Sequence, residues 1–383
     1  MSISEPGPHY RNFFSHYKSG LIYLNHASVS PLPLATYGAM EKYLRERTFG
    51  SVENFEIWLQ TVEETRKNIA ALVHAERSDQ ITLTGNTSDG LSAVAEGFPW
   101  QAGDQILLNT IEFPANIQPF RALARKGVEL VYLEPQDGKI TPEMIEEAIT
   151  PQTRMLSISA VQYLNGFKAD LKTIGEICGA RDIYFIVDGI QAVGAVPIHV
   201  IEYGIDALSS GGHKWLMSPA GTGFLYLSDP LAERLQPYKT GWQSVKDPWQ
   251  LSNFEQDWKA VSSHLETGML NTSGFIGMNE SIKMLLNIGI QHIRKTILDT
   301  SGYAIGKLRE QSRVQIFSPL QDSYRSGIVT FQFSDDTDPE ELVTALRKKN
   351  ISVSAREGMI RISIHFYNTR NEIDTALATL FNL

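Results

Sequence analysis

Residues 184–214 read YFIVDGIQAVGAVPIHVIEYGIDALSSGGHK, and this stretch decides the fold. It contains two short apolar runs of the kind that form buried strands, and polar residues follow each run. The first run ends at Asp188, and the second leads through the glycines 211–212 to His213 and Lys214. Ligands of open α/β sheets bind just beyond the carboxyl ends of the strands. The stretch therefore predicts that Asp188 and Lys214 face one pocket from neighbouring strands.

An amine and a carboxylate at such a place suit one chemistry. The amine can form a Schiff base with an aldehyde cofactor, and the carboxylate can keep the ring nitrogen of that cofactor protonated. Each residue alone also has an ordinary interpretation. A lysine in a turn is usually a surface residue, and an aspartate after a strand is often a cap or a metal ligand. The residues by themselves leave these alternatives open.

The composition is that of an ordinary globular protein. The chain has 383 residues, of which 42% are hydrophobic, and this length suffices for a large core and two domains. The net charge of −9 argues against nucleic acid as the main partner, because such a surface repels phosphate. The polar N-terminus predicts no signal peptide, and no apolar run reaches the roughly 18 residues of a membrane span. We expect a cytoplasmic protein with no membrane partner.

Cys178 is the single cysteine of the chain. One cysteine allows no internal disulfide and no cysteine zinc site, and we expect no bound metal. The surrounding segment, LKTIGEICGAR, has a helical pattern. In such a segment a cysteine is more often a packed residue than a nucleophile.

Apolar strands alternate with helical segments over much of the chain. This alternation predicts an α/β fold with a mostly parallel sheet that helices cover on both faces. The seven predicted strands lie at 80–84, 105–109, 128–133, 154–161, 184–187, 207–210 and 222–227. The last of them is a candidate for antiparallel pairing. One of the connecting helices is predicted over residues 115–126.

A different pattern begins after the last of these strands. Residues 237–263 contain several tryptophans without periodicity, which is typical of a long functional loop. The C-terminal segment then reads strand, helix, strand, strand, helix, the pattern of a small α+β domain. We expect an N-terminal arm over 1–20 that packs with the small domain, a large domain over 21–274 and a small domain over 275–383.

Two further features follow predicted strands. Thr87 and Ser88 lie in TGNTSDG, where hydroxyls and backbone N–H groups at the start of a helix form a natural phosphate site, although simple capping explains them equally. Phe113 follows the strand 105–109 and is placed to stack on a flat ring, although loop packing is its more common role. The chain has no GxGxxG fingerprint and no Walker loop, which disfavours a dinucleotide-dependent dehydrogenase.

Taken in order, the motifs resemble a known family. VDGIQA at 187–192, SGGHKWL at 210–216 and PAGTGFLY at 219–226 resemble the class V aminotransferases, which are pyridoxal 5′-phosphate enzymes of fold type I. The family includes cysteine desulfurases and isopenicillin N epimerase-like proteins. The resemblance covers nearly the whole chain and ends in REGMIRISIHFYNTRNEID. It implies the fold of these enzymes, a bound pyridoxal phosphate and a homodimer.

The resemblance assigns four residues to the ring of the cofactor. Lys214 forms the Schiff base and then moves the α-proton of the substrate. Asp188 pairs with the pyridine nitrogen, and Gln191 contacts the ring oxygen. Phe113 takes the ring-stacking place that desulfurases fill with histidine.

The resemblance also assigns residues to the phosphate and to the substrate. Thr87, Ser88 and His213 bind the phosphate. Arg361 grips the α-carboxylate of the substrate, a task that suits a planar guanidinium because it binds carboxylates bidentately. His26 is a weaker candidate for substrate binding. Other weak candidates for specificity are Tyr163, Arg356 and the loop 237–263.

Several positions depart from the family pattern. Gly211 stands where desulfurases have a serine, and Met269 stands where a threonine reaches the phosphate of the partner subunit. Tyr163 aligns with an asparagine near the ring oxygen. The loop VSAREG before Arg361 has no cysteine, and Cys178 lies in a distant segment. The nucleophile that forms a persulfide is therefore absent, and cysteine desulfuration is not expected.

The expected function is a pyridoxal phosphate enzyme that acts on a small amino acid through an external aldimine. The majority of the family favours an aminotransferase, which would also need a 2-oxo acid. An epimerase, or a lyase of the selenocysteine lyase or kynureninase type, is the alternative. A third interpretation is a binding protein without catalysis, which Met269 and Gly211 favour and which Lys214, Asp188 and Arg361 oppose.

Overall fold

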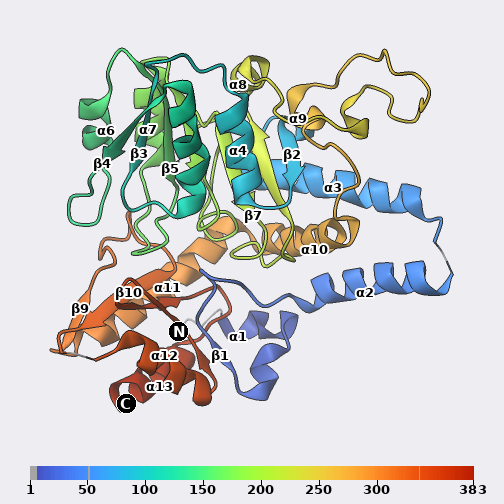
Figure 1. The fold of residues 1–383 in the computed structure, drawn as a ribbon. Helices are drawn as coiled ribbons and strands as arrows, with labels where there is room; N and C mark the ends of the chain where they lie inside the picture. Colours follow the sequence, from blue (N-terminus) through green and yellow to red (C-terminus); the bar gives the residue numbers. More distant parts are fainter. Residues whose placement is uncertain (1–6, 51, 336) are drawn as a thin grey trace.

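The computed structural model describes residues 7–50, 52–335 and 337–383 (Figure 1). A seven-stranded sheet forms the centre of the larger part. Its strands are β2 (Ile81–Thr84), β3 (Gln105–Asn109), β4 (Glu129–Leu133), β5 (Thr153–Ser159), β6 (Tyr184–Asp188), β7 (Ala207–Gly211) and β8 (Gly223–Leu227). The order is β2-β8-β7-β6-β5-β3-β4, and β8 is antiparallel to both neighbours whereas all other pairings are parallel. The predicted α/β sheet is confirmed, including its antiparallel last strand.

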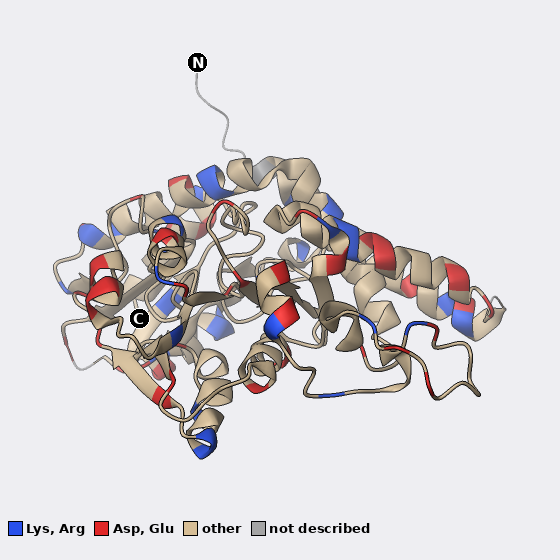
Figure 2. Cartoon of the chain, turned by 90° about the horizontal axis from the view of Figure 1, so that it is seen from above, with Lys and Arg blue, Asp and Glu red and all other residues tan. Residues whose placement is uncertain are grey.

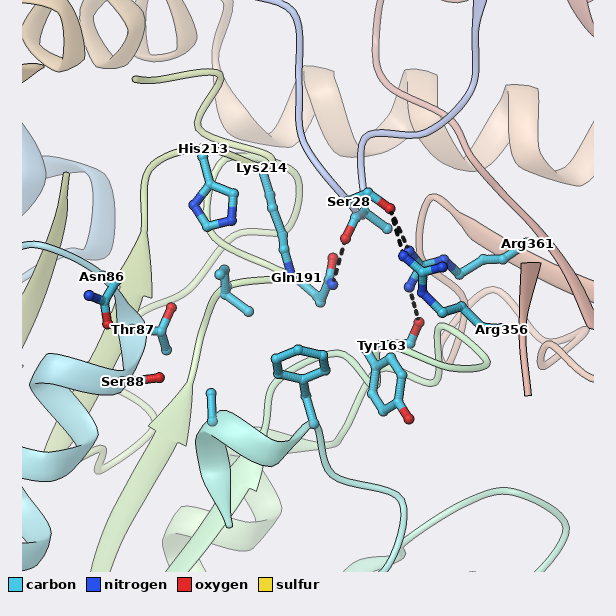
Figure 3. A pocket seen from close by; sticks show the side chains of 14 residues that line it. Ser28, Asn86, Thr87, Ser88, Tyr163, Gln191, His213, Lys214, Arg356 and Arg361 are labelled. Carbon is cyan, nitrogen blue, oxygen red and sulfur yellow. Dashed lines mark hydrogen bonds between the residues drawn. The ribbon is translucent and has the colours of Figure 1, made fainter. Parts of the chain in front are cut away.

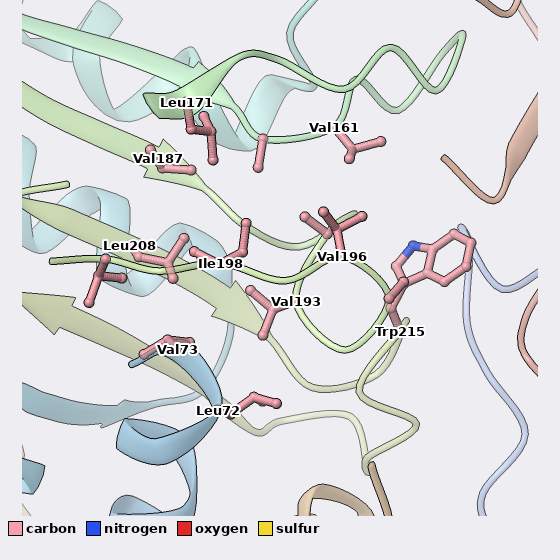
Figure 4. Close-up of a cluster of buried hydrophobic side chains, with 14 of the residues drawn as sticks. Leu72, Val73, Val161, Leu171, Val187, Val193, Val196, Ile198, Leu208 and Trp215 are labelled. Carbon is pink, nitrogen blue, oxygen red and sulfur yellow. The ribbon is translucent and has the colours of Figure 1, made fainter. Parts of the chain in front are cut away.

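Helices cover both faces of this sheet because alternate side chains of each strand point to opposite sides. Phe185 and Val187 of β6 join one core, which also receives residues from helices α3 (Phe55–Val73), α6 (Pro142–Ala148) and α7 (Leu171–Gly179). Ile186 joins the opposite core, under α4 (Thr87–Gly97) and α8 (Asp229–Arg234). Figure 4 shows part of the first core, from Leu72 and Val73 of α3 to Trp215.

The predicted continuous helix over residues 115–126 is wrong. The chain forms a 3-10 turn at Pro114–Asn116, a short helix α5 at Gln118–Arg121 and a second 3-10 turn at Ala122–Lys126. Proline has no N–H and clashes with the preceding turn of a helix. Pro119 therefore cannot lie in the interior of one long helix and lies instead in the first turn of α5.

The C-terminal part forms a second, antiparallel sheet. Its order is β12-β13-β10-β9. The strands are β9 (Val314–Ile316), β10 (Ile328–Phe333), β12 (Ser354–Arg356) and β13 (Met359–Ser363). Apolar residues of helices α11 (Ile290–Arg309), α12 (Pro339–Lys348) and α13 (Arg370–Phe381) form a separate core with it. The expected small α+β unit is confirmed, with β9 as an additional edge strand.

The N-terminal segment lies against this C-terminal part. Arg11 forms an ion pair of 3.0 Å with Glu372 of α13, and the ring of Phe14 lies 4.2 Å from that of Tyr367, measured between centroids. Residues 1–6 of the predicted arm lie outside the described residues. For the part described, the chain runs from this segment into the large sheet region through β1.

Strand β1 (Ile22–Tyr23) pairs in parallel with β11 (Ile351–Ser352), which ties the start of the chain to its end. The predicted domain boundary at residue 274 falls inside helix α10 (Thr272–Ile288), which packs against α3 and α2 (Leu34–Phe49). The domain limits therefore stay a prediction.

The tryptophan-rich loop stands away from the body of the protein (Figure 1). It contains a 3-10 turn at Trp242–Ser244 and ends in the short helix α9 (Val261–His264). Its tip exposes 60% of Trp249 and 87% of Phe254. Acidic and basic residues are interspersed along the outer helices (Figure 2). Among the described helices, none combines the length and the apolar character that crossing a bilayer requires.

Candidate active site

The carboxyl ends of the central strands open into a cavity of about 350 Å³ (Figure 3). Strands β6 and β7 are parallel neighbours, with Asp188 in register with Ser209, so their ends meet at one edge of the sheet. Asp188 ends β6, and the chain continues from β7 through two glycines to His213 and Lys214. The structure thus brings Asp188 and Lys214 together across 26 positions of sequence (214 − 188).

Lys214 points into the cavity rather than into solvent. Its side chain is 8% exposed, and its Nζ lies 5.4 Å from the centre of the Phe113 ring. Burial lowers the pKa of Lys214, and the positive charges of Arg361 and Arg356 lower it further, whereas Asp188 opposes the shift. A buried amine that loses its proton more easily than an ordinary lysine is a usable nucleophile.

Asp188 is buried at the end of β6, is not among the residues that line the cavity, and has one carboxylate oxygen without a partner. Its Oδ1 accepts a hydrogen bond of 2.9 Å from the amide of Ile190, whereas its buried Oδ2 has no partner among the described residues. Burial raises the pKa of Asp188, and the charge of Glu112 raises it further. A buried carboxylate oxygen without a partner is stabilised by a cationic hydrogen-bond donor, because an unpaired buried charge is costly.

Phe113 is held in place by the residue before it. The buried carboxylate of Glu112 accepts hydrogen bonds from Asn109 Nδ2, from the backbone N–H of Ser159 and from Gln162 Nε2, at 2.7 to 2.8 Å. These contacts fix the loop after β3. Phe113 itself is 41% exposed and turns its ring to the cavity.

The first turn of α4 lines one end of the cavity. Thr87 Oγ1 accepts a hydrogen bond of 2.9 Å from the amide of Gly211, so its own hydrogen is free to donate. Asn86 caps the helix, and its Oδ1 accepts from the amide of Asp89 at 3.0 Å. Ser88 lies beside them. Free N–H groups and the helix dipole make such a terminus a site for an anion.

His213 lies next to this turn, on the same side of the cavity (Figure 3). Burial lowers its pKa, and the charge of Lys214 adds to the effect. A neutral imidazole keeps both a donor and an acceptor nitrogen.

The opposite end of the cavity is basic. Arg361 of β13 is 2% exposed and donates to Tyr163 O at 2.7 Å and to Ser28 Oγ at 3.0 Å. Its Nε donates to Ser354 Oγ at 3.3 Å. Burial lowers the pKa of Arg361 to about 10, with a contribution from Arg356.

Gln191 lines the middle of the cavity with its amide already oriented. Its Nε2 donates to Ala27 O at 3.1 Å, and its Oε1 accepts from Trp215 Nε1 at 2.8 Å. One amide hydrogen remains for a ligand.

His26 does not reach the cavity, contrary to its prediction as a substrate residue. It is fully buried, with Nδ1 at 2.8 Å from Ser363 O and Nε2 at 2.8 Å from Tyr367 OH. Both ring nitrogens are thus engaged behind the site, and Ala27 and Ser28 line the cavity instead.

Asn86 and Ser28 are the polar lining residues that the sequence did not suggest. Asn86 directly precedes Thr87 at the helix start, and its capping role offered a signal. Ser28 contacts Arg361 across 333 positions of sequence, and no local pattern reveals such a contact.

The sequence matches the model of the family described as "Aminotransferase class-V" over residues 22–376. The chain belongs to the class V aminotransferase family. A probable cysteine desulfurase of Methanothermobacter thermautotrophicus is 29% identical over 381 residues, which cover 94% of each chain. The resemblance seen in the motifs is therefore confirmed.

Solved structures agree with this family fold. The cysteine desulfurase CsdA of Escherichia coli matches with a TM-score of 0.89 at 22% identity, over 100% of this chain and 98% of that one. A complex of the cystine C–S lyase C-DES with its product, cysteine persulfide, matches with a TM-score of 0.86 at 22% identity, over 94% of this chain and 97% of that one. The expected fold type I architecture is confirmed.

Class V enzymes depend on pyridoxal phosphate, and the residues of the cavity fit this cofactor. The unpartnered Oδ2 of Asp188 suits a protonated ring nitrogen, and the amine of Lys214 suits an aldehyde. The start of α4 suits the phosphate, and Phe113 offers a ring face. These assignments stay predictions of residue roles, which rest on geometry and chemistry together.

Proposed function

We propose that the protein is a pyridoxal phosphate-dependent lyase that breaks the Cβ–S bond of a small L-amino acid by β-elimination. The expectation of an aminotransferase has the support of the family and of the name of one relative, an uncharacterized aminotransferase of Bacillus subtilis that is 28% identical over 84% of this chain. The relatives described above support the lyase alternative. Their names, cysteine desulfurase and cystine C–S lyase, both denote the removal of sulfur from an amino acid.

The observation that carries this proposal is that no thiol lines the cavity. The chain has one cysteine, and Cys178 is 1% exposed within α7, where burial raises its pKa to about 12. The chain therefore offers no thiolate that can take sulfur from a substrate. The sulfur must leave with its own substituent, as a thiol or a persulfide, which is the outcome of β-elimination.

Different residues at the cavity have different roles in this reaction. Pyridoxal phosphate held by these residues would supply an electron sink for the carbon that loses the α-proton of the substrate. Lys214 Nζ moves that proton, because it reaches the centre of the cavity and its lowered pKa raises its fraction of free base. Arg361 orients the α-carboxylate through its remaining N–H groups. Asp188 keeps a proton on the ring nitrogen through its negative charge.

The proposed reaction needs no oxidant and no reductant. The Cα–H and Cβ–S bonds break, the sulfur leaves as a thiol, and one water is consumed as the remainder becomes pyruvate and ammonia. Desulfuration yields alanine instead, and transamination consumes a 2-oxo acid and yields another. The products therefore separate the three reactions.

The test incubates the yellow holoenzyme with L-cystine and with S-methyl-L-cysteine and measures pyruvate, ammonia, alanine and released thiol or persulfide. We expect pyruvate and ammonia in equal amounts. The variant Lys214→Ala should lose about 10²- to 10⁴-fold in turnover, the range for a positioned acid–base group. The matched control Cys178→Ala should keep its turnover, because that side chain is remote from the cavity.

Two results overturn the proposal. Alanine as the main product means desulfuration, and loss of activity in Cys178→Ala points the same way. If the pyridoxamine form accumulates and turnover occurs only when a 2-oxo acid is added, the protein is an aminotransferase instead.

A further inference from the structure

Two arginines face the end of the cavity that lies opposite the start of α4 (Figure 3). Arg361 of β13 is in register with Ser354 of β12, and Arg356 is two residues beyond Ser354 on β12. Residues two apart on a strand point to one face, so the two guanidinium groups are diagonal neighbours on one face of the hairpin. Like charges in such positions repel each other, and an anion between them removes the repulsion.

Neither arginine has an acidic partner in the described part of the chain. Within the described residues, both arginines donate their hydrogen bonds to carbonyl and hydroxyl oxygens only. Glu357, whose charge acts on Tyr163, forms an ion pair with neither. Burial and the charge of Arg356 lower the pKa of Arg361 to about 10, as expected for cations without a neutralising group.

The hydrogen-bond donors show which arginine is free for a second anion. A guanidinium has five N–H groups. Arg361 uses three of them on protein oxygens, and a bidentate α-carboxylate takes the other two. Arg356 donates to the carbonyl of the preceding residue at 2.6 Å and to Ser28 Oγ at 3.4 Å, so three N–H groups remain. Arg356, the more exposed of the two arginines, is therefore the one with N–H groups free for a second anion.

The phosphate of a cofactor is not the anion that Arg356 would bind. Asn86, Thr87 and Ser88 offer the phosphate its donors at the other end of the cavity, beyond Lys214 and Gln191 (Figure 3). The phosphate is thus accounted for without Arg356, which leaves this arginine available to a group of the substrate.

We propose, on the basis of the lyase function given above, that Arg356 binds an anionic group on the sulfur substituent of the substrate. The preferred substrates are then L-cysteine thioethers or disulfides whose leaving group carries a carboxylate, such as S-carboxymethyl-L-cysteine or L-cystine. Arg361 holds the amino-acid end that all such substrates share, and Arg356 selects the leaving group.

The first test compares two substrates of nearly equal size, S-carboxymethyl-L-cysteine and its uncharged amide, S-carbamoylmethyl-L-cysteine. We expect kcat/KM of the holoenzyme to be about 10- to 100-fold higher for the carboxylate, the range for a hydrogen bond to a charged group. In Arg356→Gln this ratio should fall to about one, mainly through KM, while the rate with the amide persists. Arg356→Lys should restore part of the ratio, because lysine keeps the positive charge but lacks the planar guanidinium that binds a carboxylate bidentately.

The matched control is Arg347→Gln, which removes an exposed arginine from α12 outside the cavity. Its substrate ratio should equal that of the unaltered protein. If the substrate ratio is unchanged in Arg356→Gln, Arg356 does not contact the leaving group, and the proposal is overturned. An equal loss with both substrates assigns it a purely structural role and overturns it as well.

A second readout does not depend on turnover. Binding of glutarate and of its monoamide to the holoenzyme is followed by the absorbance of the cofactor and by the midpoint of thermal unfolding. We expect tighter binding of glutarate by about tenfold or more, and no preference in Arg356→Gln. If no substrate yields pyruvate, the lyase function fails while this binding ratio still decides the role of Arg356.

Discussion

Asp188 has one carboxylate oxygen, Oδ2, that is buried without a partner in the described protein. The change Asp188→Asn keeps the size of the side chain and removes its charge, so a protonated ring nitrogen loses its stabilising anion. We expect turnover to fall by about 10- to 100-fold, the value of one charge-assisted hydrogen bond. Steady-state kinetics with the cofactor content fixed by absorbance give the measurement. Full turnover in a cofactor-saturated variant contradicts the role assigned to Asp188.

Two buried histidines behind the cavity make the fold sensitive to acid. His26 and His365 are fully buried, and burial lowers the pKa of His365 to about 4 and that of His26 well below its usual range. The unfolded chain binds these protons below about pH 6.5, whereas the folded protein does not. The free energy of unfolding is therefore highest above pH 6.5. It falls with decreasing pH by up to about 1.4 kcal/mol per pH unit for each histidine, and for His365 the loss is complete near pH 4.

Urea unfolding at a series of pH values between about 7.5 and 5 measures this effect. The variant His365→Gln keeps polar atoms near Trp215 O, which His365 contacts at 3.1 Å, and does not titrate. Its stability should therefore decline less steeply with falling pH than that of the unaltered protein. Parallel declines in the two proteins assign the acid sensitivity to other groups.

At the residue scale, the sequence predicted those site residues that lie in short motifs at strand ends. Asp188 ends β6, and Lys214 and Thr87 each lie three residues beyond the end of a strand, so the topology of the sheet brings them to one edge. Ser28 reaches the site through contacts that are distant in sequence, which local patterns do not encode. His26 shares its motif with Ser28, but the chain turns its ring toward Ser363 and Tyr367 instead of the cavity.

Helix α7 depends on close packing at one glycine. A Cβ at Gly175 clashes with the backbone carbonyl oxygen of Tyr203, and no side chain can move to relieve the clash. We expect Gly175→Ala to lower the free energy of unfolding by about 1–3 kcal/mol, as overpacking does. Gly179 at the end of the same helix is exposed, with no atom near an added Cβ.

Gly179→Ala is therefore the matched control for the same substitution on the same helix. It should be neutral or stabilise by up to about 1 kcal/mol, because alanine favours the helix and restricts the unfolded chain. Chemical unfolding of the two variants side by side provides the comparison. If both behave alike, the approach of α7 to Tyr203 does not contribute to stability.

At the scale of elements, long apolar patterns were predictable and short or polar ones were not. Most strands of the large sheet contain apolar runs between turns, which is why they were found. Strand β7, ALSSG, has only two apolar residues and was recognised with the help of the glycine turn that follows it. The edge strand β9 has only three residues, VQI, of which the middle one is exposed, and this is too short to form a recognisable strand pattern. The second strand predicted for the C-terminal segment, ISVSA at 351–355, divides into β11 and β12. These two strands pair with different partners, because the tertiary fold and not the local sequence decides pairing.

Helix α2 carries an apolar face that nothing in the described chain covers. Leu34, Tyr37 and Leu44 are 44%, 57% and 53% exposed. At 100° per residue they lie within about 80° of one another, on the side away from Thr36 and Tyr43, which pack toward α10 and α3. Helices α2 and α3 project together from the body, next to the exposed tryptophan loop (Figure 1).

We propose that this face binds a second copy of the chain, because a contiguous exposed apolar face is typical of an interface. The exposed apolar face of α2 thus supports the homodimer that the motifs imply.

The protein should sediment as a dimer, and Tyr37→Glu combined with Leu44→Glu should give a monomer, because burying two carboxylates at an interface is costly. Leu320→Glu, at an exposed leucine in the turn before β10, is the control and should stay dimeric. Sedimentation velocity at several concentrations measures the oligomeric state of each variant. A double variant that remains dimeric excludes α2 as the interface. A double variant that is monomeric and also loses cofactor affinity means that the partner subunit completes the site.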